Sequence, residues 1–157
     1  MSTDALRFES LGDVLHHAER IAAGSGETTG NWSAPQIIDH VRRAITCSRT
    51  GFGDVRVPAL LRLGARMMRG RFLSRTMPTG VKFPPSARSV FEPPADITMD
   101  EAMALLRDEV RQSSTPGTMT QPSPIFGRMT HEQWVKLHCR HAEMHFGFAD
   151  AGAAPAG

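Results

Sequence analysis

Histidines crowd into one short segment near the C-terminal end of the sequence. At about 100° per residue of an α-helix, His138, His141 and His145 fall in a narrow arc around Trp134, on the side that the neighbouring apolar residues assign to the core. Each imidazole that is buried loses its hydration. Three of them in one apolar stripe therefore require a compensating partner, and a metal ion is the simplest one because it takes one nitrogen from each ring.

The pair His141 and His145 has the i,i+4 spacing that places two imidazoles on adjacent turns. Zinc proteases use the same spacing in His-Glu-x-x-His, but Glu143 is at the wrong position and is expected on the opposite side of the helix, so a zinc protease is excluded. His40 lies near the edge of the inner face of another predicted helix and could add a third ligand. The spacing leaves the role of His138 open. It could replace one of the ligands, support a ligand, or be a hydrogen-bonded core histidine.

Helix-start signals of one kind occur four times along the chain. A serine or threonine cap is followed three residues later by Asp, Glu or Gln, in Ser10–Asp13, Ser33–Gln36, Thr98–Glu101 and Thr130–Gln133, of which the first is the weakest. Apolar residues at helical spacing follow each of them, which predicts an all-α protein. The predicted helices cover 11–23, 34–49, 58–69, 99–111 and 131–148, and the third is apolar on more than one side. Long Pro-rich loops cover 75–97 and 113–129.

The same helical periodicity predicts which polar side chains face solvent. His16 and His17 point away from the apolar face of the first predicted helix. Lys136, Arg140 and Glu143 fall outside the apolar stripe of the last one. We therefore expect His16 and His17 on the surface of the protein, and the other three away from the stripe that faces the core.

Composition limits the class of protein. A chain of 157 residues, 40% hydrophobic and 22% charged, is typical of one globular domain and not of disordered or collagen-like chains. We expect this domain to cover 1–148 and to be followed by a disordered Ala/Gly/Pro tail at 149–157. Cys47 and Cys139 are expected to be free thiols in a reducing compartment. Neither a signal peptide nor an apolar run of membrane-spanning length is visible, which predicts a cytoplasmic protein without membrane contact.

Basic residues dominate one stretch of the sequence. Eight of them and no acidic residue lie between Arg56 and Arg88: Arg56, Arg62, Arg66, Arg69, Arg71, Arg75, Lys82 and Arg88. Such a stripe could meet an anionic substrate or a nucleic-acid backbone. Only Phe72 and Phe83 interleave with it as stacking platforms, so we do not expect nucleic acid as a partner. The preferred interpretation is a solvated basic face, paired with acidic residues from elsewhere in the fold.

Taken in order, these motifs resemble a known group. Gly30-Asn31-Trp32-Ser33 leads through Gln36 to His40, and a terminal helix carries His141-x-x-x-His145. This combination resembles the DinB-like superfamily of bacterial proteins over about 6–148. Ile125-Phe126-Gly127-Arg128-Met129-Thr130, followed by Trp134, is similar to one branch of it. The resemblance implies an up-and-down four-helix bundle, often a homodimer, with one divalent metal ion on His40, His141 and His145; zinc and nickel are the ions we expect.

The resemblance also implies classes of activity. Some members are thiol-dependent transferases or isomerases that use a low-molecular-weight thiol such as bacillithiol or mycothiol. Many members have arginine and glutamine after the last histidine, where this sequence has Phe146-Gly147-Phe148, so the inherited substrate is in doubt. Three histidine ligands leave one position open, as in catalytic sites. We therefore predict a metal-dependent thiol S-transferase acting on a small molecule, with hydrolysis second. The alternatives are a non-enzymatic metal-binding or stress-response module and a structural bundle with core histidines.

Overall fold

The computed structural model of the chain describes residues 5–82 and 84–149. Within these ranges every regular element is a helix: α1 (Leu11–Ala23), α2 (Ala34–Thr50), α3 (Ala59–Met67), α4 (Arg69–Ser74), α5 (Pro85–Phe91), α6 (Met99–Ser113) and α7 (His131–Phe146). Extended pairing in the described residues is limited to the isolated bridges Thr28–Ala149 and Ser123–Gly127. The predicted all-α class is therefore confirmed.

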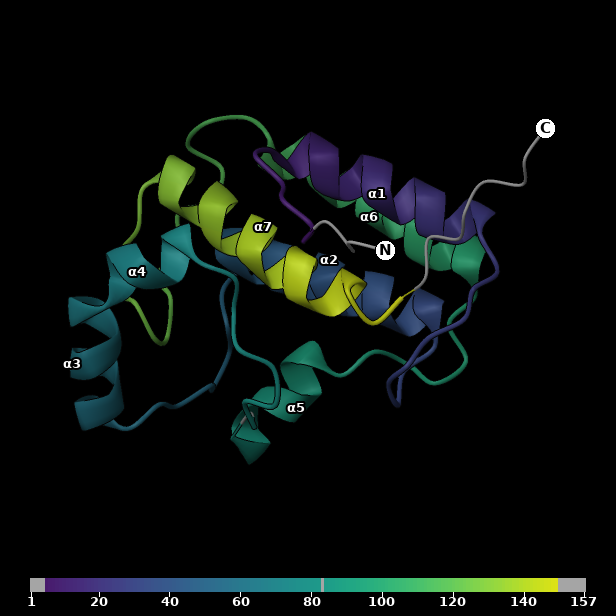
Figure 1. Cartoon of the computed structure of the whole chain (residues 1–157). Helices are drawn as coiled ribbons and strands as arrows, with labels where there is room; N and C mark the ends of the chain where they lie inside the picture. Colours follow the sequence, from purple (N-terminus) through teal and green to yellow (C-terminus); the bar gives the residue numbers. More distant parts are fainter. Residues whose placement is uncertain (1–4, 83, 150–157) are drawn as a thin grey trace.

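The four longest helices, α1, α2, α6 and α7, pack against one another and form what we call the four-helix body. Helices α3 and α4 lie at one end of this body, and α5 packs beside α2 (Figure 1). Fully buried apolar side chains from all four long helices, including Val14, Ile38, Leu106 and Ala142, make up the core. The finer prediction of an up-and-down bundle of the DinB-like type stays a prediction.

Capping determines where the four helices of the body begin. In each of them the side chain of the cap residue accepts the backbone N–H three residues on, whose own side chain bonds back to the cap: Ser10, Ser33, Thr98 and Thr130. The predicted boundaries of α1 are reproduced. Helices α2 and α6 run one and two residues further than predicted, and α7 ends two residues earlier, at Phe146.

The region between the second and the sixth helix departs further from prediction. The single helix expected at 58–69 is divided at Met68, whose backbone (φ −96°, ψ 6°) leaves the helical range between α3 and α4. The loop expected at 75–97 contains α5, which was not predicted because prolines flank it. Pro85 stands at the start of α5, where a helix tolerates the missing N–H. No described helix is long and apolar enough to cross a membrane.

His17 was expected on the surface and is buried, so this prediction was wrong; Arg140 and Glu143, expected outside the core-facing stripe, are buried too. His17 stacks on Phe146, with ring centroids 5.8 Å apart. Arg140 and Glu143 form a buried ion pair of 2.9 Å that clasps the backbone of Phe8, whose N–H donates to Glu143 at 2.6 Å and whose carbonyl accepts from Arg140. The segment before α1 therefore covers this side of α7, which the periodicity of α7 alone cannot reveal.

The two cysteines form no disulfide, as the sequence predicts. Cys47 and Cys139 are unpaired and buried. Burial raises the pKa of Cys47 to about 11 and that of Cys139 to about 12, so both stay as thiols at neutral pH. Of the tail expected to be disordered, Ala149 pairs with Thr28, and 150–157 lie outside the described residues.

Candidate metal centre

The three histidines predicted as metal ligands converge in the structure. His40 Nε2 lies 3.2 Å from His141 Nε2 and 3.0 Å from His145 Nε2. All three side chains offer a ligand nitrogen within 4.8 Å of the others, so the cluster could hold a metal ion. Nitrogens at about 2.0–2.1 Å from a tetrahedral zinc ion lie about 3.3 Å apart, close to the separations found here. The donor set therefore fits a small divalent cation.

Two helices of the four-helix body bring these rings together. His40 is fully buried on α2, and α2 packs directly against α7. His141 and His145 come from adjacent turns of α7, with ring centroids 4.5 Å apart. The i,i+4 spacing thus supplies half of the geometry, and the packing of α2 on α7 supplies the rest.

A backbone carbonyl fixes the orientation of the His40 ring. Phe91 O lies 2.8 Å from His40 Nδ1. Because a carbonyl can only accept, the proton of a neutral ring must be on Nδ1, and the Nε2 lone pair then points at the other two histidines. Metal-binding histidines commonly use their second nitrogen in this way. Phe91 belongs to α5, so a helix that sequence reasoning missed contributes to the site.

Burial keeps the three imidazoles neutral. Desolvation lowers the pKa of His145 to about 3, with a smaller contribution from the charge that His40 would carry. Desolvation also lowers the pKa of His40, although the hydrogen bond to Phe91 acts in the opposite direction, and it lowers that of His141 well below its usual value. Neutral rings have the lone pairs that a metal ion needs.

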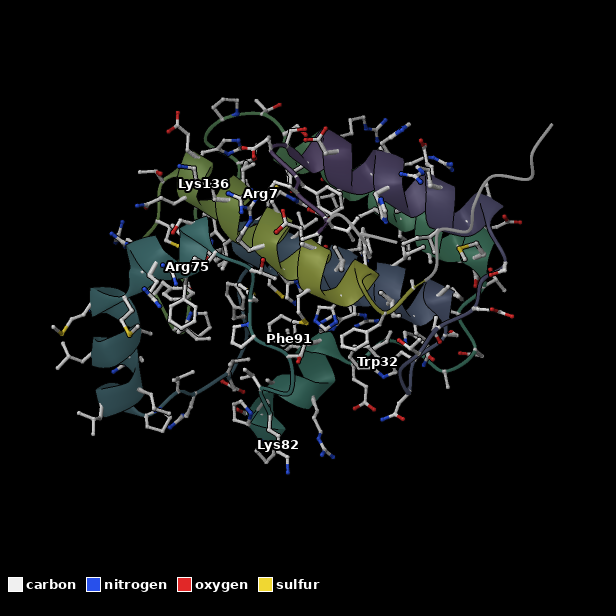
Figure 2. All side chains as sticks on the ribbon, viewed as in Figure 1. Arg7, Trp32, Arg75, Lys82, Phe91 and Lys136 are labelled. Atoms are coloured by element: carbon white, nitrogen blue, oxygen red, sulfur yellow. The ribbon has the colours of Figure 1, made fainter. Side chains whose placement is uncertain are left out.

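Aromatic rings surround the histidine cluster and a pocket opens beside it. The Trp32 ring lies 4.7 Å from the His40 ring and 6.1 Å from the His145 ring, and the Phe91 ring lies 6.2 Å from His40. Figure 2 labels Trp32 and Phe91, on the side of the body where α5 lies. A pocket of about 350 Å³ is lined by Gly30, Asn31, Trp32, Ile37, His145 and Phe148. A small molecule could therefore reach the cluster from the side of His145.

The fourth histidine of the stripe, His138, lies outside the cluster. Its Nε2 is 3.0 Å from Ser48 Oγ, and that hydroxyl donates its proton to the Ile45 carbonyl at 2.6 Å. His138 must therefore be the donor to Ser48. Burial lowers its pKa to about 3, and its ring stacks on Trp134 with centroids 5.3 Å apart. Of the three interpretations left open, the hydrogen-bonded core histidine is the one that the contacts support.

A buried carboxylate beside the cluster was not singled out from the sequence. Asp39, fully buried and next to His40, accepts from Arg42 Nε at 2.9 Å and from Arg43 Nε at 2.7 Å. Its oxygens are not among the ligand atoms of the cluster. The spacing Asp39-x-x-Arg42-Arg43 is the signal that could have predicted these ion pairs on one helix.

The interpretation of the basic stretch was wrong in one respect. Its eight residues were expected to pair with acidic residues from elsewhere, but none of them forms an ion pair in the described part of the chain. Arg69 instead donates from Nη1 to the Arg128 carbonyl at 3.0 Å. Among residues 5–82 and 84–149 the stretch therefore has no ion-paired acidic partner.

Comparison with known proteins gives a family. The family described as "Protein of unknown function (DUF1569)" matches residues 1–151, nearly the whole chain. The chain belongs to the DUF1569 family. No curated protein and no solved structure matches this DUF1569 chain. The resemblance to the DinB-like superfamily stays a prediction, because no match connects the chain to that group.

Proposed function

We propose that this protein binds one divalent metal ion, zinc or nickel, through His40, His141 and His145, and offers an open coordination position to a small-molecule substrate. The observation that supports it is the convergence of three neutral imidazoles beside a pocket that reaches His145. Imidazole suits zinc and nickel equally. Three protein ligands with one open position are typical of catalytic metal sites.

The residues around the cluster have distinct parts in this proposal. When bound, the ion would lower the pKa of a thiol or a water molecule and so supply a nucleophile near neutral pH. The Phe91 carbonyl orients His40 through its Nδ1–H. Trp32 packs against the rings of His40 and His145 and would shield them in part from bulk water. Asn31, in the lining of the pocket, offers a side-chain amide to a polar group of the substrate.

Within this proposal the preferred reaction is the transfer of a low-molecular-weight thiol to an electrophile, with hydrolysis second. The reaction class rests on the resemblance to DinB-like proteins. The two buried, unpaired cysteines support a reducing location such as the cytoplasm. We expect the metal-loaded protein to consume one thiol of a panel when an electrophile is present. The decrease in free thiol concentration measures this reaction. Turnover of neither thiols nor hydrolysable esters would contradict an enzymatic role.

Metal analysis of protein purified without a histidine tag tests the metal centre directly. We expect one ion per chain, reduced to background in His40→Gln and in His145→Gln, because each variant removes one of three ligands. His16→Gln is the matched control, since His16 is exposed on α1. His138→Gln should also keep its metal, because that ring is bonded to Ser48. Equal metal content in His145→Gln and wild-type protein would overturn the proposal.

A second candidate, a non-enzymatic interaction module, is favoured by one observation. Helix α3 and the residue after it expose large apolar side chains: Leu60, Leu61, Leu63, Met67 and Met68. Contiguous apolar surface of this kind commonly marks an interaction site. We propose a homodimer, as the resemblance implies, with this face as the contact. Light scattering should then show a dimer that Leu60→Asp converts to a monomer; a wild-type monomer at all concentrations would contradict it. Metal binding without turnover, together with dimerisation, would favour the module over the enzyme.

A further inference from the structure

We infer that a second pocket, on the other side of Phe52 from the histidine cluster, binds the phosphate or carboxylate group of a small anionic molecule through Arg62 and Arg66. This proposal does not depend on the metal centre. The pocket has a volume of about 630 Å³ and lies between residues 51–55, helix α3 and the loop 121–128. That volume is in the range of about 300–1,000 Å³ that small-molecule sites occupy.

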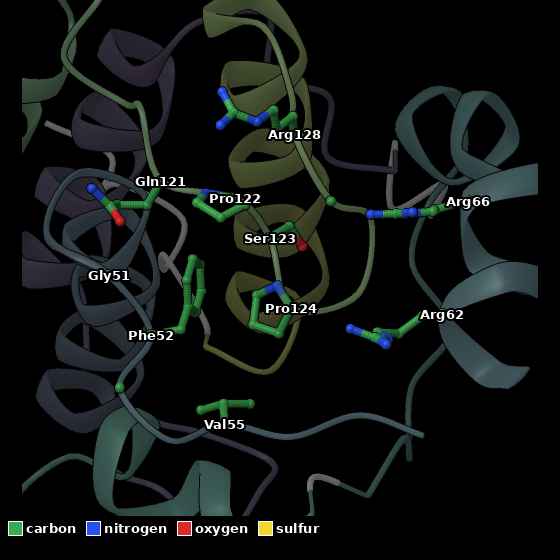
Figure 3. A pocket seen from close by; sticks show the side chains of 12 residues that line it. Gly51, Phe52, Val55, Arg62, Arg66, Gln121, Pro122, Ser123, Pro124 and Arg128 are labelled. Atoms are coloured by element: carbon green, nitrogen blue, oxygen red, sulfur yellow. The ribbon is translucent and has the colours of Figure 1, made fainter. Parts of the chain in front are cut away.

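Helix α3 turns its charged side, not its apolar side, toward the protein. Leu60 and Met67 are 80% and 82% exposed. At about 100° per residue, Arg62 and Arg66 point about 100–160° away from them around the helix axis. Figure 3 shows both arginines extending from α3 toward Ser123 and Pro124 across the pocket. A surface helix normally faces the core with its apolar stripe, so this orientation brings two cations to one cavity.

The wall opposite α3 is a tight, preformed loop. Ser123 and Gly127 exchange two backbone hydrogen bonds of 2.8 and 3.0 Å. Gly127 has a φ of +73°, and a Cβ there would overlap the guanidinium of Arg66. The glycine therefore permits both the turn and the close approach of Arg66. Ser123 Oγ accepts from the N–H groups of Ile125 and Phe126, so its hydroxyl is held at the pocket wall.

The charge of the pocket has no ion-paired counterpart among the described residues. Arg62, Arg66 and Arg128 line it together with Gln121, and no lining residue is acidic. The three arginines form no ion pair in the part of the chain that the structure describes. Asp54 is exposed and follows Gly53 but is not in the lining. Guanidinium groups match phosphate and carboxylate oxygens with two parallel hydrogen bonds, so an oxyanion would supply the negative charge that the pocket lining lacks.

A wall of aromatic rings separates this pocket from the histidine cluster. Phe52 lines the pocket and packs against both Phe91 and Trp134, with ring centroids 6.1 and 5.8 Å apart. Phe91 in turn holds His40 through its carbonyl. The two sites are therefore distinct, and removal of the arginines should not change the metal content.

Calorimetric titration of the full-length protein with inorganic phosphate, pyrophosphate and malonate tests the proposal. We expect saturable binding of at least one of these anions, weakened about tenfold or more in Arg62→Gln and in Arg66→Gln, because each removes a charge-assisted contact. Arg88→Gln, the matched control, removes the same charge from the same basic stretch on α5, outside the pocket. Its affinity should change less than about twofold.

The results of this titration identify the class of ligand or overturn the proposal. Binding of phosphate or pyrophosphate alone assigns the pocket to phosphate compounds, and binding of malonate alone assigns it to carboxylates. No saturable binding of any of the three anions would overturn the proposal. An equal loss of affinity in Arg88→Gln and Arg62→Gln would also overturn it, because it would show attraction by net charge without a site. Circular dichroism of the variants should match the wild type, since both pocket arginines are exposed.

Discussion

The four-helix body and the region 51–97, which contains α3, α4 and α5, treat their apolar and charged side chains in opposite ways. In the body, Ile38 and Leu106 are fully buried. Its buried charges are paired, as in Arg140–Glu143. In the described part of the region 51–97, Leu60 points to solvent and the basic residues form no ion pair. These side chains of the body are buried or paired within the chain, whereas the other region leaves some of its own for a partner or a ligand.

Both candidate sites use the border between these two regions. Phe91 of α5 reaches into the body and orients His40. Arg66 of α3 reaches across to Gly127, in the loop that leads into α7. The body carries the histidines of the candidate metal centre, and the region 51–97 adds Phe91, which orients one of them, and the arginines of the second pocket. Connecting segments on a stable scaffold commonly carry functional groups in this way.

The largest expected difference between the two regions is the loss of stability when a buried charge of the body is removed. Arg140→Ala leaves Glu143 unpaired under Phe8 and removes the bond from Arg140 to the Phe8 carbonyl. Breaking one partner of a buried pair lowers the free energy of unfolding by about 3–5 kcal/mol. Arg62→Ala, in the region 51–97, should change it by no more than about 0.5 kcal/mol. Urea denaturation measures both; equal losses would show that the two regions do not differ.

The same contrast applies to apolar side chains. Leu106→Ala opens a cavity in the core and should cost about 2–5 kcal/mol of unfolding free energy. Leu60→Ala removes the same atoms from an exposed position on α3, so at low protein concentration we expect a change within about 0.5 kcal/mol. Repeating the urea experiment at high concentration sharpens the comparison. A Leu60→Ala cost that appears only there would place Leu60 in a contact between copies.

The body is also the region that the sequence predicts well, because its signals are local. The caps Ser33 and Thr130 fix where α2 and α7 begin, and apolar periodicity orients them. The histidine spacing on α7 then puts His141 and His145 on one side, and the packing of α2 brings His40 to them.

What the sequence does not reveal depends on contacts between distant segments. Helical spacing made α3 apolar on more than one side and could not show that Arg62 and Arg66 face the pocket. Phe91 orients His40 from a seven-residue helix between prolines, too short for a periodic signal. Arg140 and Glu143 are buried by the segment that carries Phe8, more than 130 residues away in the chain. The periodicity of α7 cannot predict that this segment packs on it.

Acid should weaken the body selectively, because all seven histidines of the chain lie outside 51–97. The pKa of His138 is about 3 in the folded protein against 6.5 for a free side chain. Between these values the unfolded chain binds a proton that the folded chain does not, so stability is fully present above about pH 6.5 and falls as the pH drops toward about 3. His138→Gln, which can still donate to Ser48, should reduce the slope by up to about 1.4 kcal/mol per pH unit.

Urea denaturation at several pH values in the presence of a chelator measures this slope without a contribution from bound metal. His16→Gln is the control, because His16 is exposed on α1 and should leave the slope unchanged. A slope that is the same in His138→Gln and in the wild type would mean that the ring is protonated in the folded protein. Its Nε2–H would still donate to Ser48 Oγ, and the added proton would be on Nδ1.

The smallest expected effect concerns the caps, which the body has and α3, α4 and α5 lack. Thr130→Ala removes the side-chain oxygen that accepts the Gln133 N–H and should lower the free energy of unfolding by about 1 kcal/mol. Thr130→Ser keeps that oxygen and should restore most of it. Thr76→Ala makes the same change at an exposed position of the region 51–97 and should cost no more than about 0.5 kcal/mol. If Thr76→Ala lowered the free energy of unfolding as much as Thr130→Ala, the region 51–97 would fold as part of the body. The exposed leucines of α3 would then have to be explained without a partner.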